Sequence, residues 1–267
     1  MERLARTVTI VNGMFFPRLL TVLFATTSVA PLGAEEWKPN LPDPAQFQAG
    51  AFVYERNCLI CHGPLGDGKG ELSPTLVPKP RSFRSGIFKY SSTPSSKLPT
   101  NEDLTRTIRG GLSNTAMGMF TALRDEEVRA VVEYVKRFSR KWRNEANYAP
   151  PIEVPPLPAW WSDPAELRRR ATAGRETFRT LCATCHGETA DGKGPVAAAL
   201  RDQWGDPIAP ADLRQRSPHT GRAPRDVFRV LLTGINGTPM VSFAAALTDE
   251  QRWQLAAYID ELRKTAN

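Results

Sequence analysis

The chain has 267 residues, of which 41% are hydrophobic, 24% charged and 9% aromatic. This composition is ordinary for a globular protein and argues against a wholly disordered, collagen-like or polytopic membrane chain. The formal net charge is +7, from 35 bases and 28 acids; because the bases are dispersed, they argue against a nucleic-acid binder and are compatible with an acidic partner surface. The length predicts two domains of roughly 100–120 residues each.

The first 34 residues have the features of a secretory signal peptide. Arg3, Arg6 and Arg18 precede an apolar run of 12 residues (19–30), and small residues then lead to Ala34. This order predicts export to the periplasm, with cleavage after Ala34. An uncleaved membrane anchor is the alternative, although a spanning helix needs about 20 apolar residues.

The next predicted element is a helix that runs into the first cysteine motif. Gly50 and Tyr54 stand eight and four residues before Cys58, so they share one helical face, which a second helix can approach closely at the glycine. The motif reads Cys58-Leu-Ile-Cys61-His62. Two cysteines at this spacing also suit a redox dithiol, half of a zinc site or a short-loop disulfide, but a histidine directly after them is the attachment signature of c-type haem. We expect a thioether at each cysteine and the imidazole at the iron.

Three further features complete the first half. A glycine-rich turn, Asp67-Gly-Lys-Gly70, leaves the motif. Near the end, an amphipathic segment with a 3.6-residue period predicts a helix from about Asp125 to residue 135. Between them lies a loop with Met117 and Met119. Low-spin iron in an electron carrier needs a sixth ligand, and methionine opposite histidine raises the reduction potential relative to two histidines.

A proline-rich connection follows. Five prolines fall between residues 149 and 159, and Trp160 and Trp161 come next. Such a segment favours an extended polyproline conformation. It can hold the two domains apart or run along their interface, and the paired tryptophans favour the second arrangement. Asp163 and Pro164 then predict the N-cap and first turn of a new helix.

The second half repeats the first at an offset of 124 residues. Each feature before and within the motif has a counterpart: Gly174, Phe178, Cys182, Cys185, His186 and the turn Asp191-Gly-Lys-Gly194. A second amphipathic helix is predicted to begin near Asp249. Because all four cysteines of the chain fall in the two motifs, the repeat predicts two covalently attached haem c groups.

A matched methionine supports a sixth ligand in each half. Met117 stands 55 residues after His62, and Met240 stands 54 residues after His186. Apart from Met1 and Met14, which belong to the predicted signal peptide, every methionine of the chain lies in these two loops. The register with Met240 and a shared phenylalanine favours Met117 over Met119. The alternative role of such a methionine is a flexible core filler.

Three remaining residues carry weaker hypotheses. Arg84 and Arg214 align only at an offset of 130, and the first half compensates afterwards with extra sequence around residues 86–99. Arginine offers bidentate hydrogen bonds to carboxylates, so both are candidates for pairing with haem propionates; a solvated surface position is the alternative. His219 has no counterpart in the first half, and we expect it at the surface or behind a ligand rather than on an iron.

Taken together, each half resembles a class I cytochrome c domain. The glycine–aromatic helix, the CxxCH motif, the late methionine loop and the final aromatic helix occur in family order over residues 43–140 and 165–264. The resemblance implies an all-α fold of two tandem domains, 35–141 and 164–267, joined by a linker at 142–163, with each haem in a hydrophobic crevice. It implies thioethers at Cys58, Cys61, Cys182 and Cys185 and iron ligands at His62, Met117, His186 and Met240. One position departs from the pattern: many members have proline before the methionine, as at Pro239, where the first half has Ala116.

These features predict a periplasmic dihaem cytochrome that passes single electrons between redox proteins, without substrate chemistry. Between the predicted ligands the first half carries eight bases and four acids, and the second half seven and six. We therefore expect the first half to face a redox partner with an acidic docking surface, since complementary charge raises the encounter rate. Two alternatives remain: the dihaem subunit of a membrane-bound oxidase or dehydrogenase complex, and a dihaem peroxidase.

Overall fold

The computed structural model describes residues 37–112, 115–215 and 223–265. Within these ranges the regular structure is helical, apart from one isolated bridge between Arg201 and Pro207, and residues 38–267 form one compact unit. The all-α prediction is confirmed. The predicted signal peptide and His219 lie outside the described residues. In the described part of the chain, no helix has the length and apolar character needed to cross a bilayer.

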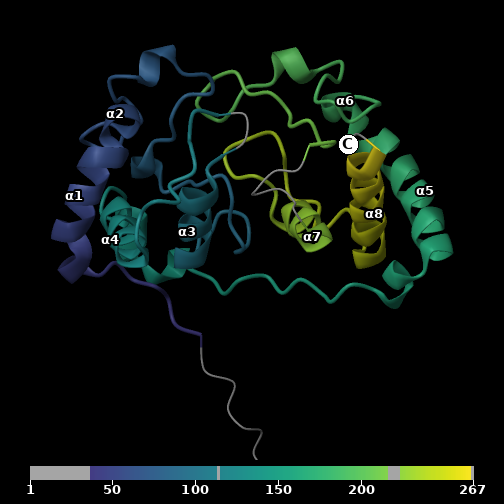
Figure 1. Ribbon diagram of the computed structural model, residues 1–267, viewed down its shortest axis with the longest axis horizontal. Coiled ribbons are helices and arrows are strands. Elements are labelled where there is room, and N and C mark those ends of the chain that lie inside the picture. Colours follow the sequence, from purple (N-terminus) through teal and green to yellow (C-terminus); the bar gives the residue numbers. More distant parts are fainter. Residues whose placement is uncertain (1–36, 113–114, 216–222, 266–267) are drawn as a thin grey trace, which may run out of the picture. The chain divides into compact units, whose positions relative to one another are not determined.

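Each half of the sequence forms a lobe (Figure 1). The first lobe, residues 38–148, contains η1 (Pro44–Gln46), α1 (Phe47–Asn57), α2 (Leu59–His62), η2 (Ser73–Thr75), η3 (Phe83–Ser85), α3 (Asn101–Gly110), α4 (Asp125–Lys136), η4 (Arg140–Arg143) and η5 (Glu145–Asn147). The second lobe, residues 159–265, contains η6 (Ala159–Ser162), α5 (Pro164–Leu181), α6 (Ala183–His186), η7 (Ala197–Ala199), α7 (Pro224–Thr233) and α8 (Asp249–Thr265).

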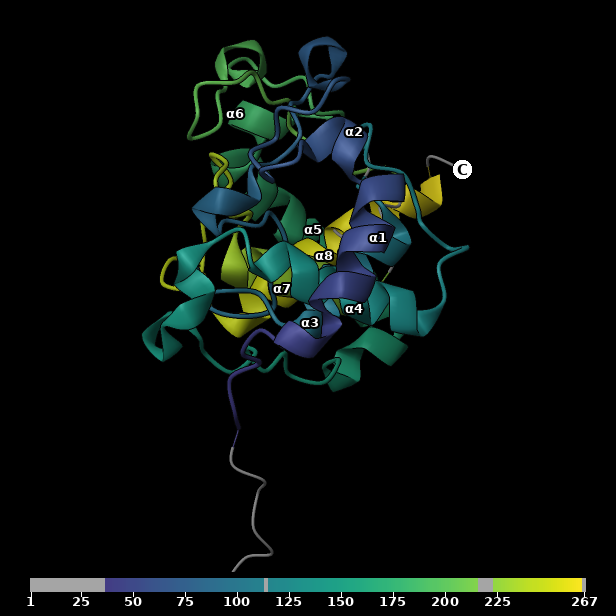
Figure 2. The ribbon, with the colours of Figure 1, turned by 90° about the vertical axis from the view of Figure 1, so that its left-hand side faces the viewer.

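The helix that leads into each cysteine motif crosses the last long helix of its lobe, as the repeated glycine and aromatic predicted. In the first lobe α1 crosses α4 (Figures 1 and 2). A Cβ placed on Gly50 would lie 2.2 Å from the carbonyl oxygen of Ala130, and the rings of Tyr54 and Tyr134 are 5.2 Å apart. Only glycine permits so close an approach of two backbones.

The second lobe repeats this crossing with α5 and α8. A Cβ on Gly174 would lie 2.0 Å from the carbonyl oxygen of Gln254, and Phe178 and Tyr258 are 5.4 Å apart between ring centroids. Both crossings fix the start of the motif relative to the final helix, so the cysteine motif of each lobe rests on a packed helix pair.

The final helices bury the apolar faces that their periodicity predicted. On α4, Val128, Val131 and Val132 are fully buried. On α8, Arg252 takes the place of a valine but is also buried, because its guanidinium donates to the carbonyl of Phe243 at 3.2 Å. The neighbouring Trp253 supplies the apolar surface that Arg252 lacks, with its ring 4.4 Å from that of Phe228.

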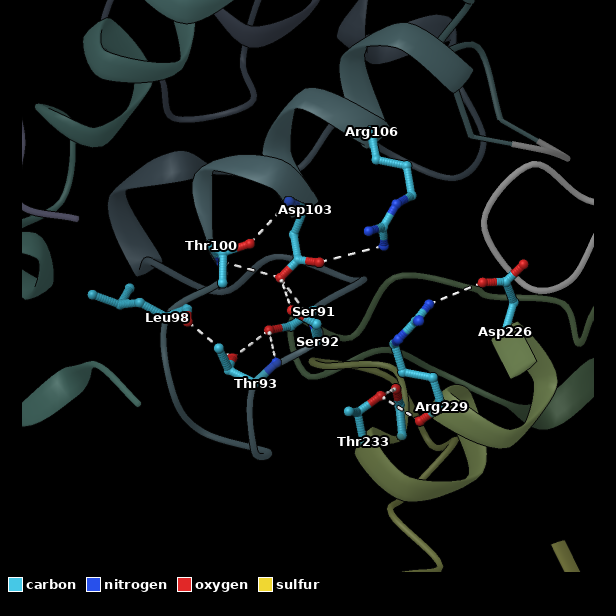
Figure 3. A network of polar contacts seen from close by, with 11 residues as sticks. Ser91, Ser92, Thr93, Leu98, Thr100, Asp103, Arg106, Asp226, Arg229 and Thr233 are labelled. Atoms are coloured by element: carbon cyan, nitrogen blue, oxygen red, sulfur yellow. Dashed lines mark hydrogen bonds and ion pairs between the residues drawn. The ribbon is translucent and has the colours of Figure 1, made fainter. Parts of the chain in front are cut away.

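The extra sequence of the first lobe is held by one buried carboxylate at the start of α3 (Figure 3). Asp103 accepts hydrogen bonds from the backbone nitrogen and hydroxyl of Ser92 at 2.8 and 2.9 Å. It also accepts from the backbone nitrogen of Thr100 at 3.0 Å, and the Thr100 hydroxyl accepts from the Asp103 backbone nitrogen at 3.1 Å, which forms a capping box. The insertion is therefore folded against α3.

The proline-rich linker contacts both lobes. The backbone nitrogen of Ile152 donates to the carbonyl of Ser92 in the first lobe at 2.7 Å. Two residues later, Val154 is buried in the core of the second lobe and its carbonyl accepts from Arg225 at 2.6 Å. The linker is thus bonded to both lobes.

Candidate cofactor sites

The first motif forms a single helical turn directly after α1. Cys58 ends α1, with its backbone nitrogen donating to Tyr54, and His62 donates back to the carbonyl of Cys58 at 2.9 Å. The two thiols therefore lie about one turn apart on α2, both half-buried and free. Burial, and secondarily Cys61, raise the pKa of the Cys58 thiol to about 12, so this thiol is protonated at neutral pH.

His62 is oriented by a backbone carbonyl. Its Nδ1 lies 3.0 Å from the carbonyl oxygen of Arg81. Because a carbonyl oxygen only accepts, Nδ1 carries the proton and the lone pair is on Nε2, the state required of a metal ligand. Burial lowers the pKa of His62 to about 4, which keeps the imidazole neutral. Phe83 stacks on the ring at 4.3 Å between centroids and restricts its rotation.

These groups line a crevice that is open to solvent and has a cavity volume of about 140 Å³. Its wall is largely apolar, with residues from α3 and α4 among those that contribute, and both motif cysteines, His62 and Met117 border it. An apolar crevice with one neutral imidazole, one thioether sulfur and two thiols matches the donor set of haem c.

The structure separates the two candidate methionines of the first lobe. Met117 is half-buried and lines the crevice together with Ala116 and Gly118. Met119 is 63% exposed and does not border it.

The two methionine loops are built alike. In the first, Leu112 donates its backbone nitrogen to the carbonyl of Met117 at 2.8 Å, and the Thr115 hydroxyl donates to the carbonyl of Leu112 and accepts from the Met117 nitrogen. Ile235, Thr238 and Met240 make the same three bonds in the second lobe. None of these bonds uses the nitrogen of Ala116 or Pro239, so the first loop reaches the same conformation without the proline.

The second site follows the same scheme as the first. His186 is partly buried, and its Nδ1 lies 3.1 Å from the carbonyl oxygen of Ala211; burial lowers the pKa of this imidazole as well. Burial, and secondarily Cys185, raise the pKa of Cys182 to about 11. Cys182 and Met240 both pack against the core of the second lobe. In the first lobe, Cys58, Cys61, His62 and Met117 thus border one crevice.

Neither of the arginines considered for the haem propionates borders the first crevice. Arg84 is exposed and does not border the crevice, and Arg214 pairs with Asp212 at 2.7 Å. The basic side chains at the first crevice are instead those of Lys79, Arg81 and Lys89. Sequence reasoning missed Arg81 because it has no arginine counterpart in the second half, where Ala211 stands at the same 130-residue offset.

A family described as "Cytochrome C oxidase, cbb3-type, subunit III" matches the chain twice, over residues 45–135 and 169–259. The chain belongs to this cytochrome c family. Among solved structures, a chain of the Kuenenia stuttgartiensis reducing HAO-like protein complex is similar to it, with a TM-score of 0.74 and 37% sequence identity, covering 80% of this chain and 96% of that one. A search of the curated proteins gave no match.

Family membership confirms the resemblance to tandem cytochrome c domains. Two such domains imply two haem c groups in an electron-transfer protein, and each lobe of this cytochrome contains a CxxCH turn to receive one. The imidazole held by a backbone carbonyl in each lobe fits the group.

Proposed function

We propose that the chain is an exported dihaem cytochrome c that carries single electrons between redox proteins in the periplasm. In this proposal residues 1–34 are a cleaved signal peptide, 35–141 and 164–267 are the two domains, and 142–163 is the linker. The axial ligands are His62 and Met117 in one domain and His186 and Met240 in the other. The thioether bonds form at Cys58, Cys61, Cys182 and Cys185.

One observation carries the assignment of the ligands. In the first crevice His62 is held as the neutral Nδ1–H tautomer by the Arg81 carbonyl, and Met117, rather than Met119, borders the same cavity. An imidazole lone pair and a thioether sulfur at one apolar cavity, with two thiols beside it, are the donors of a low-spin iron carrier.

The chain attaches, orients and shields the cofactor. Each cysteine would hold the haem through a thioether, in which the thiol S–H has added across a vinyl C=C with no net oxidation. The bound group supplies one iron that gains or loses a single electron. The Arg81 and Ala211 carbonyls fix the imidazoles, and the apolar walls exclude water, which keeps one ligand set through both oxidation states.

The surface around the first crevice suits transient docking. Val77, between the lining residues Leu76 and Pro78, is 75% exposed, and Met119 beside Met117 is 63% exposed. Together with the excess of bases in this half, these exposed apolar side chains next to lining residues support a partner with an acidic docking surface. The rate of reduction by such a partner should fall as ionic strength rises; a flat profile would contradict electrostatic steering.

A second candidate function is a subunit of a larger redox assembly. The comparisons favour it, because the family takes its description from an oxidase subunit and the similar solved structure is part of a protein complex. Purification of the tagged protein from its source under mild conditions distinguishes the two roles. A carrier elutes at about 30 kDa, whereas a subunit co-purifies in constant ratio with other chains.

Redox titration of the purified protein, followed by visible and near-infrared spectra, tests the proposal. We expect two haems per chain and a ferric near-infrared band from sulfur ligation at each. Met117→His should abolish that band in one haem, and Met119→Leu is the matched control that should leave both bands intact. A band lost in the control alone would move the ligand to Met119. Turnover of hydrogen peroxide with a reduced donor would favour a peroxidase instead.

A further inference from the structure

One residue of the first lobe lies between the first candidate haem site and the turn of the second lobe that contains Gly237. The backbone of Arg81 is fixed by the first motif, since its carbonyl accepts from His62 and the backbone nitrogen of Phe83 donates to Gly66 at 2.7 Å. The preceding Pro80 carbonyl lies against Gly68, where a Cβ would come within 2.4 Å. The position of Arg81 is therefore tied to the imidazole proposed as the ligand of the first iron.

The side chain of Arg81 extends into the second lobe. Its guanidinium carbon lies 3.9 Å from the ring centroid of Trp204, and Nη1 lies 3.9 Å from a carboxylate oxygen of Asp202. Trp204 sits in a turn that is fixed by its own bonds: Asp202 accepts from the nitrogens of Trp204 and Asp206 at 2.9 and 3.1 Å. Arg81 thus packs on a rigid platform.

That platform is joined to the second methionine loop. Gln203 donates its backbone nitrogen to the carbonyl of Gly237 at 3.1 Å. A Cβ on Gly237 would lie 2.9 Å from the Trp204 ring and 3.2 Å from Arg81 Nη1, so the stack closes directly over this residue. Gly237 lies within the turn that the bond from Ile235 to Met240 closes. The stack therefore contacts the loop that presents the proposed sulfur ligand of the second iron.

The Arg81 guanidinium is buried without a full set of hydrogen-bond partners and without a counter-charge at hydrogen-bond distance. The Arg81 side chain is 12% exposed, and its buried Nε has no hydrogen-bond partner. The Asp202 contact at 3.9 Å is longer than a charge-assisted hydrogen bond. A buried cation paired this loosely acts strongly on nearby charges, because little water screens it.

We propose that Arg81 is a positioning residue that couples the two haems: through its stack on Trp204, the state of each haem site sets the reduction potential of the other. This inference rests on the proposal that both sites hold haem. Such coupling is a reciprocal free energy. A change at Trp204 must therefore alter the reduction potential of the first haem, and a change at His62 must alter that of the second.

Substitutions on either side of the stack test the coupling in the full-length holoprotein. Trp204→Leu removes the second-lobe partner, Arg81→Gln removes charge and stack, and Arg81→Lys keeps the charge without the planar group. Arg84→Gln is the matched control, because it makes the same charge change three residues along at an exposed position. Haem content is measured first, as the pyridine haemochrome. The potential of each haem then follows from its ferric haem-methyl NMR signals during redox titration, assigned with Met240→His.

We expect Trp204→Leu to shift the reduction potential of the first haem and Arg81→Gln that of the second. Each shift should be about threefold in the redox equilibrium constant, or about 28 mV at 59 mV per tenfold. Arg81→Lys should restore the reduction potential of the first haem only, and Arg84→Gln should change the potential of neither haem. The coupling would be overturned if both haems are present and the potential shifts only in the substituted lobe. It would also be overturned if Arg84→Gln gives equal shifts or if Arg81→Lys restores both potentials. Fewer than two haems in the unsubstituted protein would overturn the proposed function instead. If Arg81→Gln does not fold, Trp204→Leu decides alone.

Discussion

Replacing Gly50 with alanine should destabilise the first lobe, although alanine is the better helix former. In an exposed helix this change gains about 1 kcal/mol. Here the new Cβ would lie 2.2 Å from the carbonyl oxygen of Ala130 and 2.6 Å from the Cβ of Tyr134. Non-bonded atoms pack at about 3.5 Å, so α1 and α4 have to separate by roughly 1 Å.

The size of the effect follows from two opposing terms. Overpacking of this kind costs about 1–3 kcal/mol, and contact with backbone on both sides places Gly50 at the upper end. After the helix-propensity gain, the net loss is about 2 kcal/mol, which lowers Tm by about 8–16 °C for a domain of this size. Because Val131 and Val135 of α4 line the crevice, the wall of the haem site moves as well.

Thermal unfolding followed by circular dichroism and by the Soret band measures this loss. Gly174→Ala makes the equivalent change in the second lobe, where the Cβ would lie 2.0 Å from the Gln254 carbonyl, and should give a similar loss. A rise in Tm for Gly50→Ala would refute the close-crossing argument.

Three further predictions concern the first site. Tyr54→Phe removes a buried hydroxyl that donates to the Gly63 carbonyl at 2.7 Å and should cost about 1–3 kcal/mol in urea unfolding; an unchanged midpoint would show that the bond contributes nothing. Burial lowers the pKa of Lys89 from 10.5 to about 8, so between these values the folded protein binds fewer protons than the unfolded chain and stability rises with pH. Loss of the positive charge on Lys89 favours ferric iron, so the reduction potential of the first haem should fall as the pH rises through 8. A fall that persists in Lys89→Gln would show that another group causes it. Ala116→Pro copies Pro239 and should stabilise the loop by about 0.4–1 kcal/mol with both near-infrared sulfur bands retained; loss of one band would show that proline does not fit.

The parts of the fold that depend on local spacing could be predicted from the sequence. A glycine four residues before an aromatic predicted the close helix crossings at Gly50 and Gly174. The two residues share one helical face, and the glycine lets a second helix approach that face closely. The methionine loops were visible because methionine is rare in this chain. The residues at each site were likewise apparent, since their chemistry lies in the side chains.

Features that depend on the backbone or on distant partners could not be predicted. The acceptor for each imidazole is a carbonyl, which every residue carries, so Arg81 and Ala211 share a role with no shared side chain. The propionate hypothesis chose Arg84 because it has an arginine counterpart, but Arg81 is the one that reaches the crevice. The contact between Arg81 and Trp204 joins residues more than 120 positions apart, and no sequence pattern indicates it.

The tethering of the linker has a consequence for how the molecule would work with its partners. Since Ile152 is bonded to one lobe and Val154 to the other, neither centre is free to diffuse away from its neighbour. Exchange between them is then unimolecular, with a rate independent of dilution. Under the proposed function, a donor that binds one lobe and an acceptor that binds the other would not have to meet, so one chain would serve two partners with incompatible surfaces.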